Sequence, residues 1–195
     1  MELILASQSP RRRALLEQMG LHFTVHAADI DETMDPSLPA GEEVARVSRA
    51  KALAVPRGPE DVVIAADTIV VCQGRILGKP HTPERAAEML ALLSGRDHQV
   101  MTGCTVVRGD RVLSHLETTH LHFRPLLPEE IRAYTATGEP LDKAGAYGIQ
   151  GLGGLFVERL EGDYYNVMGL PICALTGLLR QVGVPVLGVG KEVRP

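Results

Sequence analysis

Residues 61–72, DVVIAADTIVVC, constrain the fold of this chain more than any other segment. They are apolar at almost every position, a pattern typical of a central strand whose two faces are both covered. Asp67 and Thr68 interrupt the run. Because a buried carboxylate without a partner is costly, we expect Asp67 either to face a cleft at the end of a strand or to be paired. A functional acid in this place can activate a water molecule or bind a metal.

The segments around this strand alternate between strand and helix patterns. Ser9 followed by Pro10 marks a helix start, because a hydroxyl caps the helix and proline fits its first position. The turn Gly109-Asp110 joins two strands in a hairpin, so the sheet cannot be purely parallel. We therefore expect an α/β fold with a mixed twisted sheet flanked by helices. Strands are expected at residues 2–6, 23–27, 61–72, 98–108, 111–124 and 155–160, and helices at residues 10–19, 42–54, 83–93, 128–137 and 170–182.

The composition is that of an ordinary soluble domain. Of the 195 residues, 45% are hydrophobic and 23% are charged, so a single bilobed domain over residues 1–195 can bury a sizeable core. A net charge of −4 provides no basic face for nucleic acid. No stretch approaches the roughly 20 apolar residues that cross a membrane, so we expect a cytoplasmic protein with no membrane partner. The cysteines lie in apolar runs and are expected to be buried thiols: Cys72, Cys104 and Cys173.

The segment SQSPRRR at residues 7–13 has the features of a phosphate-binding loop. A helix N-terminus offers free N–H groups and the positive end of a dipole, and arginine donates paired hydrogen bonds to phosphate oxygens. A capped surface helix with solvated arginines is the alternative interpretation. Three arginines in the first helical turn oppose the dipole unless an anion is bound, and this favours the phosphate site.

Other polar residues allow both a functional and an ordinary interpretation. The loop at residues 28–35 can join Asp67 at a metal such as Mg²⁺ or Mn²⁺, or it can simply be solvated. Lys51 lies within a predicted helix, where lysine is usually exposed. Lys79 stands between a glycine and a proline that would hold its backbone, although lysine is also common in turns. The acids of the loop are Asp29, Asp31, Glu32 and Asp35.

Residues 139–154, EPLDKAGAYGIQGLGG, contain five glycines and are expected to form a structured, functional loop. They match neither the GxxxxGK[ST] phosphate loop nor the GxGxxG dinucleotide-binding pattern. Within them, Gln150 can pair with the edge of a base and Tyr147 can pack against a ring. A flexible loop without a ligand is the ordinary alternative.

Taken together, three sets of motifs resemble the Maf family of nucleotide pyrophosphatases: LASQSPRRRALLEQMG, ADTIVV with GKP, and EPLDKAGAYGIQGLGG with YYNVMGLP. They occur in the family's order and cover nearly the whole chain. The resemblance implies a fold like that of inosine triphosphate pyrophosphatase, with two lobes around a cleft. It also implies a divalent cation, Mg²⁺ or Mn²⁺, and the ability to form a homodimer. Maf proteins hydrolyse nucleoside triphosphates to the monophosphate and pyrophosphate, as house-cleaning enzymes.

The resemblance assigns roles to individual residues. Asp67 corresponds to the catalytic acid, and Glu32 to a second acid that would bind the metal with it. A departure from members that have a glutamate before the lysine is seen at Leu77-Gly78-Lys79, from which we expect no change of reaction. The residues that correspond to phosphate-binding positions are Ser7, Arg12, Arg13, Lys51 and Lys79. The residues that match members acting on dTTP and UTP are Arg11, Thr68 and Gln150.

The reaction implied is attack of a metal-assisted water on the α-phosphorus, with pyrophosphate as the leaving group. Whether Asp67 is the base, a metal ligand or both stays open. One alternative function is a non-enzymatic nucleotide sensor that regulates cell division or septum formation through the same pocket. A second alternative is a nucleic-acid-binding module built on the arginines, against which the net charge of −4 argues.

Overall fold

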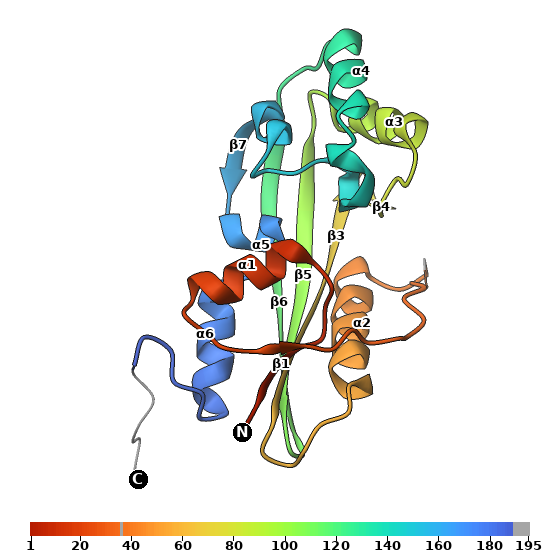
Figure 1. Ribbon diagram of the computed structural model, residues 1–195. Helices are drawn as coiled ribbons and strands as arrows, with labels where there is room; N and C mark the ends of the chain where they lie inside the picture. Colours follow the sequence, from red (N-terminus) through yellow and green to blue (C-terminus); the bar gives the residue numbers. More distant parts are fainter. Residues whose placement is uncertain (36, 189–195) are drawn as a thin grey trace. The chain divides into compact units, whose positions relative to one another are not determined.

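The computed structural model describes residues 1–35 and 37–188, which form two compact units (Figure 1). The first unit comprises Met1–Asp67, Thr102–Glu117 and the chain from Gly169 onward. The second comprises Thr68–Met101 and Thr118–Met168. The chain passes between the units within strands at residues 67–68, 101–102 and 117–118 and once more at residues 168–169, and each unit has a hydrophobic core of its own.

The described residues form a seven-stranded sheet with the main order β2, β1, β3, β5, β6, β7, and β4 pairs with β3. β1 is parallel to both β2 and β3, whereas β4 is antiparallel to β3 and β7 is antiparallel to β6. The predicted mixed sheet is therefore confirmed, and so is the hairpin of β5 and β6. The strands are β1 (Leu3–Leu5), β2 (Thr24–Val25), β3 (Val62–Cys72), β4 (Arg75–Leu77), β5 (Asp97–Arg108), β6 (Arg111–Phe123) and β7 (Val157–Glu161).

In the first unit, Figure 1 shows α2 on one side of the strands and α6 on the other. The start of α1 follows the sequence prediction, because the hydroxyl of Ser9 accepts a hydrogen bond from the backbone N–H of Arg12 at 3.5 Å and Pro10 begins the helix. The chain leaves α1 through Gly20, whose φ of 72° is a left-handed conformation that glycine adopts without strain. The helices are α1 (Pro10–Gln18), α2 (Ala40–Ala54) and α6 (Ile172–Gln181).

In the second unit, the core is built around aromatic rings. The ring of Phe123 lies 4.8 Å from that of Tyr147 and 5.9 Å from that of Phe156, in edge-to-face arrangements. Thr82 caps α3 by accepting a hydrogen bond from the backbone N–H of Arg85 at 3.2 Å. The helices are α3 (Pro83–Leu93), α4 (Pro128–Ala136) and α5 (Tyr164–Met168), with 3₁₀ turns η1 (Glu139–Asp142), η2 (Ala144–Ala146) and η3 (Leu152–Phe156).

Three local features differ from the sequence predictions. α2 begins at Ala40 rather than at residue 42, and the short helix α5 was not predicted. The expectation that all three cysteines are buried is wrong for Cys173, which is exposed, whereas Cys72 and Cys104 are buried. Cys173 occupies the outer face of α6, and an apolar run of letters does not reveal which face of a helix each residue takes.

Among residues 1–35 and 37–188, none of the helices combines the length and the apolar character required to span a lipid bilayer.

α2 approaches the sheet closely at Gly103 of β5. A Cβ atom at this position would lie 2.6 Å from the backbone carbonyl oxygen of Val44 in α2. One turn further along the helix, the hydroxyl of Ser48 lies 2.8 Å from that of Thr105, which in turn lies 3.0 Å from that of Ser114. Close backbone packing and a chain of hydroxyls therefore hold α2 against the strands.

We predict that Gly103→Ala destabilises the protein, because the added methyl group would meet backbone atoms that cannot rotate away. The free energy of unfolding should fall by about 2 kcal/mol, as for other overpacked sites. Gly177→Ala in α6 is the control, because a Cβ there would have no atom within 4 Å. Urea unfolding compares the two variants, and equal stability would argue against the close approach of α2 to β5.

Candidate active site

Ser7 and Arg12 hold each other in place where β1 leads into α1. The hydroxyl of Ser7 accepts hydrogen bonds from the backbone N–H of Ser9 at 3.2 Å and from Nη1 of Arg12 at 3.1 Å. Nε of Arg12 donates to the carbonyl oxygen of Gly169 at 2.7 Å. The guanidinium is thus oriented by the loop before α1 and by the segment before α6, both in the first unit.

Arg12 lies in the electrostatic field of other predicted residues. Burial lowers the pKa of Arg12 from its ordinary value, and the negative charges of Asp67 and Glu32 act in the opposite direction. The positive charge of Arg11 adds to the lowering. Because arginine keeps its proton in proteins, Arg12 remains a cation. The structure therefore brings a fixed guanidinium under the influence of two carboxylates.

Lys51 links the two predicted acids. Its Nζ lies 2.6 Å from Oδ1 of Asp67 and 2.9 Å from Oε1 of Glu32. Lys51 is 7% exposed and Asp67 is 9% exposed, so their ion pair is shielded from water. The side chain of Glu32 is 54% exposed and lies on the solvent side of the pair. We call these residues, with Ser7 and Arg12, the charged cluster.

The burial of Lys51 corrects the interpretation that a lysine in this helix is exposed. α2 packs tightly on the sheet, and polar residues on its inner face are buried with it. A buried ammonium requires an anionic partner, which Asp67 supplies. Asp67 itself lies in the middle of β3 rather than at a strand end. Of the two arrangements expected for this acid, the paired one is observed, and the partner is itself a predicted site residue.

Glu32 and Asp67 are suitable ligands for a hard divalent cation. Both carboxylates approach one point, the Nζ of Lys51, and carboxylate oxygens are the ligands that Mg²⁺ and Mn²⁺ prefer. In the part of the chain that the structure describes, no group of three or more His, Cys, Asp or Glu side chains has the arrangement of a metal site. Two carboxylates nevertheless fit a cation such as Mg²⁺, which usually keeps waters and substrate phosphate oxygens among its ligands.

The second unit carries three further predicted residues. Thr68 of β3 is half-buried, whereas Lys79 and Gln150 are exposed. Lys79 lies in the connection between β4 and α3. The carbonyl oxygen of Gly78 accepts a hydrogen bond from the backbone N–H of Gly145 at 3.2 Å, which attaches this connection to the glycine-rich loop. The structure therefore places the Lys79 segment and the glycine-rich loop next to each other.

Glu139, for which no role was predicted, holds the turn that contains Gln150. Its carboxylate accepts hydrogen bonds from the hydroxyl of Tyr134 at 2.9 Å and from the backbone N–H groups of Leu152 and Gly153 at 3.1 and 3.2 Å. An acid at the start of a glycine-rich segment was the available signal, because a carboxylate can accept several backbone N–H groups. The predicted structured loop is therefore confirmed, and the carboxylate of Glu139, its first residue, binds the backbone near its other end.

Two other predicted side chains, those of Tyr147 and Arg13, lie in the core and on the surface, respectively. Tyr147 is 5% exposed, and its hydroxyl lies 2.9 Å from Nε2 of His98 in the core of the second unit. Its ring packs edge-to-face against those of Phe123 and His98, so the rings that it contacts in the structure belong to the protein. Arg13 is exposed and lines a surface hollow with Glu17 and Phe23.

We predict that Lys51→Met destabilises the fold, because it leaves the buried carboxylate of Asp67 without its ammonium. The free energy of unfolding should fall by about 3 kcal/mol, the lower end of the range for half-broken buried pairs. Adding Asp67→Asn should restore most of this loss, because neither charge of the Lys51–Asp67 pair is then left without its partner. Thermal unfolding measures both effects, with Arg49→Met on the exposed face of α2 as the control. A Lys51→Met variant as stable as the unaltered protein would argue against the buried pair.

Known proteins resemble this chain over nearly its full length. A family model described as Maf-like protein matches residues 2–182. A protein of Moorella thermoacetica named dTTP/UTP pyrophosphatase is 53% identical over 191 residues, which cover 96% of this chain and 98% of the relative. A protein of the same name from Halalkalibacterium halodurans is 53% identical over 182 residues, covering 93% of this chain and 96% of the relative.

Among solved structures, a HAM1 protein from Coxiella burnetii is similar with a TM-score of 0.49 and 15% identity, over 93% of this chain and 99% of that chain. The family assignment depends on the sequence matches. Because the family model spans nearly the whole chain and both relatives share more than half of the aligned residues, the chain belongs to the Maf family.

Proposed function

We propose that this chain hydrolyses dTTP and UTP, and modified pyrimidine triphosphates, to the monophosphate and pyrophosphate. The two relatives at 53% identity are named dTTP/UTP pyrophosphatase and align with almost the whole chain. The observation that carries the proposal is the buried contact of 2.6 Å between Lys51 and Asp67, with Glu32 and Arg12 around it. Cleavage of a phosphoanhydride depends on positioned cations and carboxylates of this kind.

The residues of the charged cluster can perform distinct tasks in this reaction. Arg12 and Lys51 can neutralise charge on the triphosphate, because fixed cations stabilise the negative charge that develops in the transition state. Ser7 keeps the guanidinium of Arg12 in place through its hydrogen bond of 3.1 Å. Asp67 can accept the proton of a water whose oxygen bonds to the α-phosphorus. The bond from that phosphorus to the bridging oxygen breaks, and pyrophosphate leaves.

Glu32 and Asp67 are the residues that we propose to hold the divalent cation implied by the family resemblance, Mg²⁺ or Mn²⁺. Such a cation, when bound, supplies charge neutralisation at phosphoryl oxygens. The support is that both carboxylates contact the same ammonium, at 2.9 and 2.6 Å. Asp67 can be the base, a metal ligand or both, because each of its two oxygens can serve a different partner.

Arg11, Thr68 and Gln150 are proposed to select the base. A site that hydrogen-bonds one base edge rejects bases that leave its groups unpaired. The amide of Gln150 offers both a donor and an acceptor at an exposed position. Lys79 and Arg13 are proposed as further phosphate contacts. Arg13 has the weaker support of the two, because its side chain lines a surface hollow with Phe23.

This activity fits a house-cleaning enzyme that removes excess or modified pyrimidine nucleotides. We propose that it acts in the cytoplasm and that it can form a homodimer. The alternative function is a non-enzymatic nucleotide sensor that regulates cell division or septum formation. Nucleotide binding without release of pyrophosphate would favour that alternative.

We predict that Asp67→Asn lowers kcat for dTTP by about 1,000-fold, the effect expected when a general base is lost. Pyrophosphate release at a fixed Mg²⁺ concentration measures the rate, and circular dichroism confirms the fold. Asp110→Asn, at an exposed position in the turn between β5 and β6, is the matched control and should keep full activity. A fully active Asp67→Asn variant would remove this residue from the reaction.

We predict that the protein prefers dTTP and UTP over GTP and ATP. Pyrophosphate release from a panel of nucleoside triphosphates measures this preference. Gln150→Ala should reduce this discrimination by roughly 10-fold or more, because hydrogen bonds to the base edge are lost. Gln181→Ala at the end of α6 is the control and should leave the preference unchanged. A preference of the unaltered protein for guanine nucleotides would overturn the assignment of the base.

A further inference from the structure

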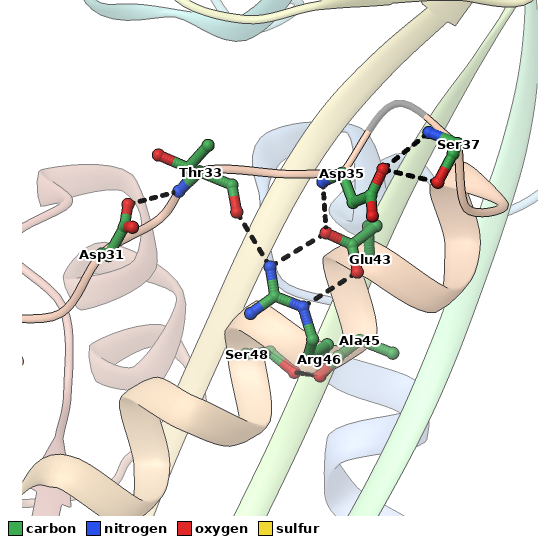
Figure 2. Close-up of polar contacts among 8 residues, drawn as sticks. All are labelled: Asp31, Thr33, Asp35, Ser37, Glu43, Ala45, Arg46 and Ser48. Carbon is green, nitrogen blue, oxygen red and sulfur yellow. Dashed lines mark hydrogen bonds and ion pairs between the residues drawn. The ribbon is translucent and has the colours of Figure 1, made fainter.

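The first turns of α2 carry an ion pair between Glu43 and Arg46, for which no role was predicted. Oε1 of Glu43 accepts a hydrogen bond from Nε of Arg46 at 2.8 Å, and Oε2 accepts one from Nη2 at 2.9 Å (Figure 2). The side chain of Glu43 is 1% exposed, whereas that of Arg46 is 49% exposed. A paired contact of this geometry fixes the orientation of both side chains.

This pair also binds the backbone of the acidic loop. Nη2 of Arg46 donates to the carbonyl oxygen of Thr33 at 2.9 Å, and the backbone N–H of Asp35 donates to Oε2 of Glu43 at 2.7 Å. Figure 2 shows the backbone groups of Thr33 and Asp35 facing the pair, whereas the carboxylates of Asp31 and Asp35 bind within the loop. Thr33 directly follows Glu32 in the chain. The backbone on one side of Glu32 is therefore attached to α2.

The same helix contacts Glu32 at a second place. Lys51 follows Glu43 by eight residues on the same face of α2, about 12 Å along the helix axis. Its Nζ lies 2.9 Å from Oε1 of Glu32. α2 therefore binds the backbone beside Glu32 through Arg46 and the carboxylate of Glu32 through Lys51. A half-exposed glutamate in a loop is thus restrained at both ends.

Glu43 is ionised at neutral pH. A hydrogen bond from the side chain of Arg46, followed by one from the backbone of Asp35, lowers its pKa from 4.5 to about 2. Because the folded state lowers this pKa, the ionised Glu43 stabilises the fold at any pH above its ordinary pKa of 4.5. This contribution is lost as the pH falls through about 2. The contacts to the loop therefore persist through the neutral range.

We propose that Glu43 and Arg46, which we call the α2 clamp, are positioning residues that hold Glu32 in place for the reaction. This inference rests on the proposed function, in which Glu32 binds the divalent cation. Residues that orient a metal ligand commonly change metal affinity or activity by about 10- to 100-fold when they are replaced. The clamp touches neither the proposed substrate contacts nor Asp67, so it acts through the loop.

The second unit offers a matched control. Arg124 and Glu130 form the same kind of pair, with hydrogen bonds of 3.0 and 2.7 Å, and Glu130 also accepts a backbone N–H, that of Leu127, at 2.9 Å. The hydrogen bond from Arg124 is likewise the main cause that lowers the pKa of Glu130 to about 2. This pair resembles the α2 clamp in its hydrogen bonds, with a more exposed glutamate at 31%, and it binds the backbone of Leu155 instead of the acidic loop.

The test compares Arg46→Met with Arg124→Met in the full chain. We expect Arg46→Met to lower kcat for dTTP by 10- to 100-fold, to weaken Mn²⁺ binding in calorimetry by a similar factor, and to speed hydrogen exchange at the amide of Asp35. Arg46→Lys should give an intermediate result, because lysine keeps the charge and loses the paired geometry. Arg124→Met should leave all three quantities unchanged.

Equal effects of the two methionine variants would overturn the proposal, as would Arg46→Met with unchanged exchange at Asp35. A change in exchange without a change in Mn²⁺ affinity would also overturn it, because the loop would then move without affecting the ligand. Failure of the unaltered protein to release pyrophosphate from any triphosphate would refute the proposed function instead. The exchange and Mn²⁺ measurements would still decide the role of the clamp in that case.

Discussion

The buried contact between Lys51 and Asp67 is the interaction around which the first unit is arranged. It joins the middle of β3 to the inner face of α2, and it requires that helix to lie close enough for an ammonium to meet the carboxylate at 2.6 Å. Gly103 permits the close approach, because any larger residue would meet the backbone of α2. The contact between Ser48 and Thr105, one turn before Lys51, orients the same face. The ion pair, Gly103 and the hydroxyl contact thus all hold the inner face of α2 against the sheet.

Much of the fold follows from local sequence signals, because those signals act within a few residues. Ser9 and Thr82 cap helices in the structure as their position before proline predicts. The apolar run at residues 61–72 forms a buried interior strand, and the turn at Gly109 joins two long strands. The limits of most elements differ from the predicted ones by a residue or two, since helix and strand ends depend on what packs against them.

The site was predictable in composition and less so in arrangement. Asp67 stands out in sequence because it interrupts an apolar run, and its burial follows. The burial of Lys51 does not follow, because a lysine in a helix is ordinarily exposed and only the contact with β3 reverses that preference. Glu43 and Arg46 were missed for a related reason: a glutamate and an arginine three residues apart are typical of a surface helix. Their hydrogen bonds to the loop join backbone groups 8 and 13 residues away in the chain, which the helix pattern does not reveal.

Lys51 also neutralises part of the negative charge of the charged cluster. An ammonium that contacts both Glu32 and Asp67 is their internal counter-ion. In the proposed function, a divalent cation that took the carboxylate oxygens now held by Lys51 would exchange one positive charge for another. The displaced ammonium would be available to the negative charge of an incoming triphosphate, the role proposed above for Lys51. Cation and nucleotide binding would then be thermodynamically linked through Lys51, and each would strengthen the other.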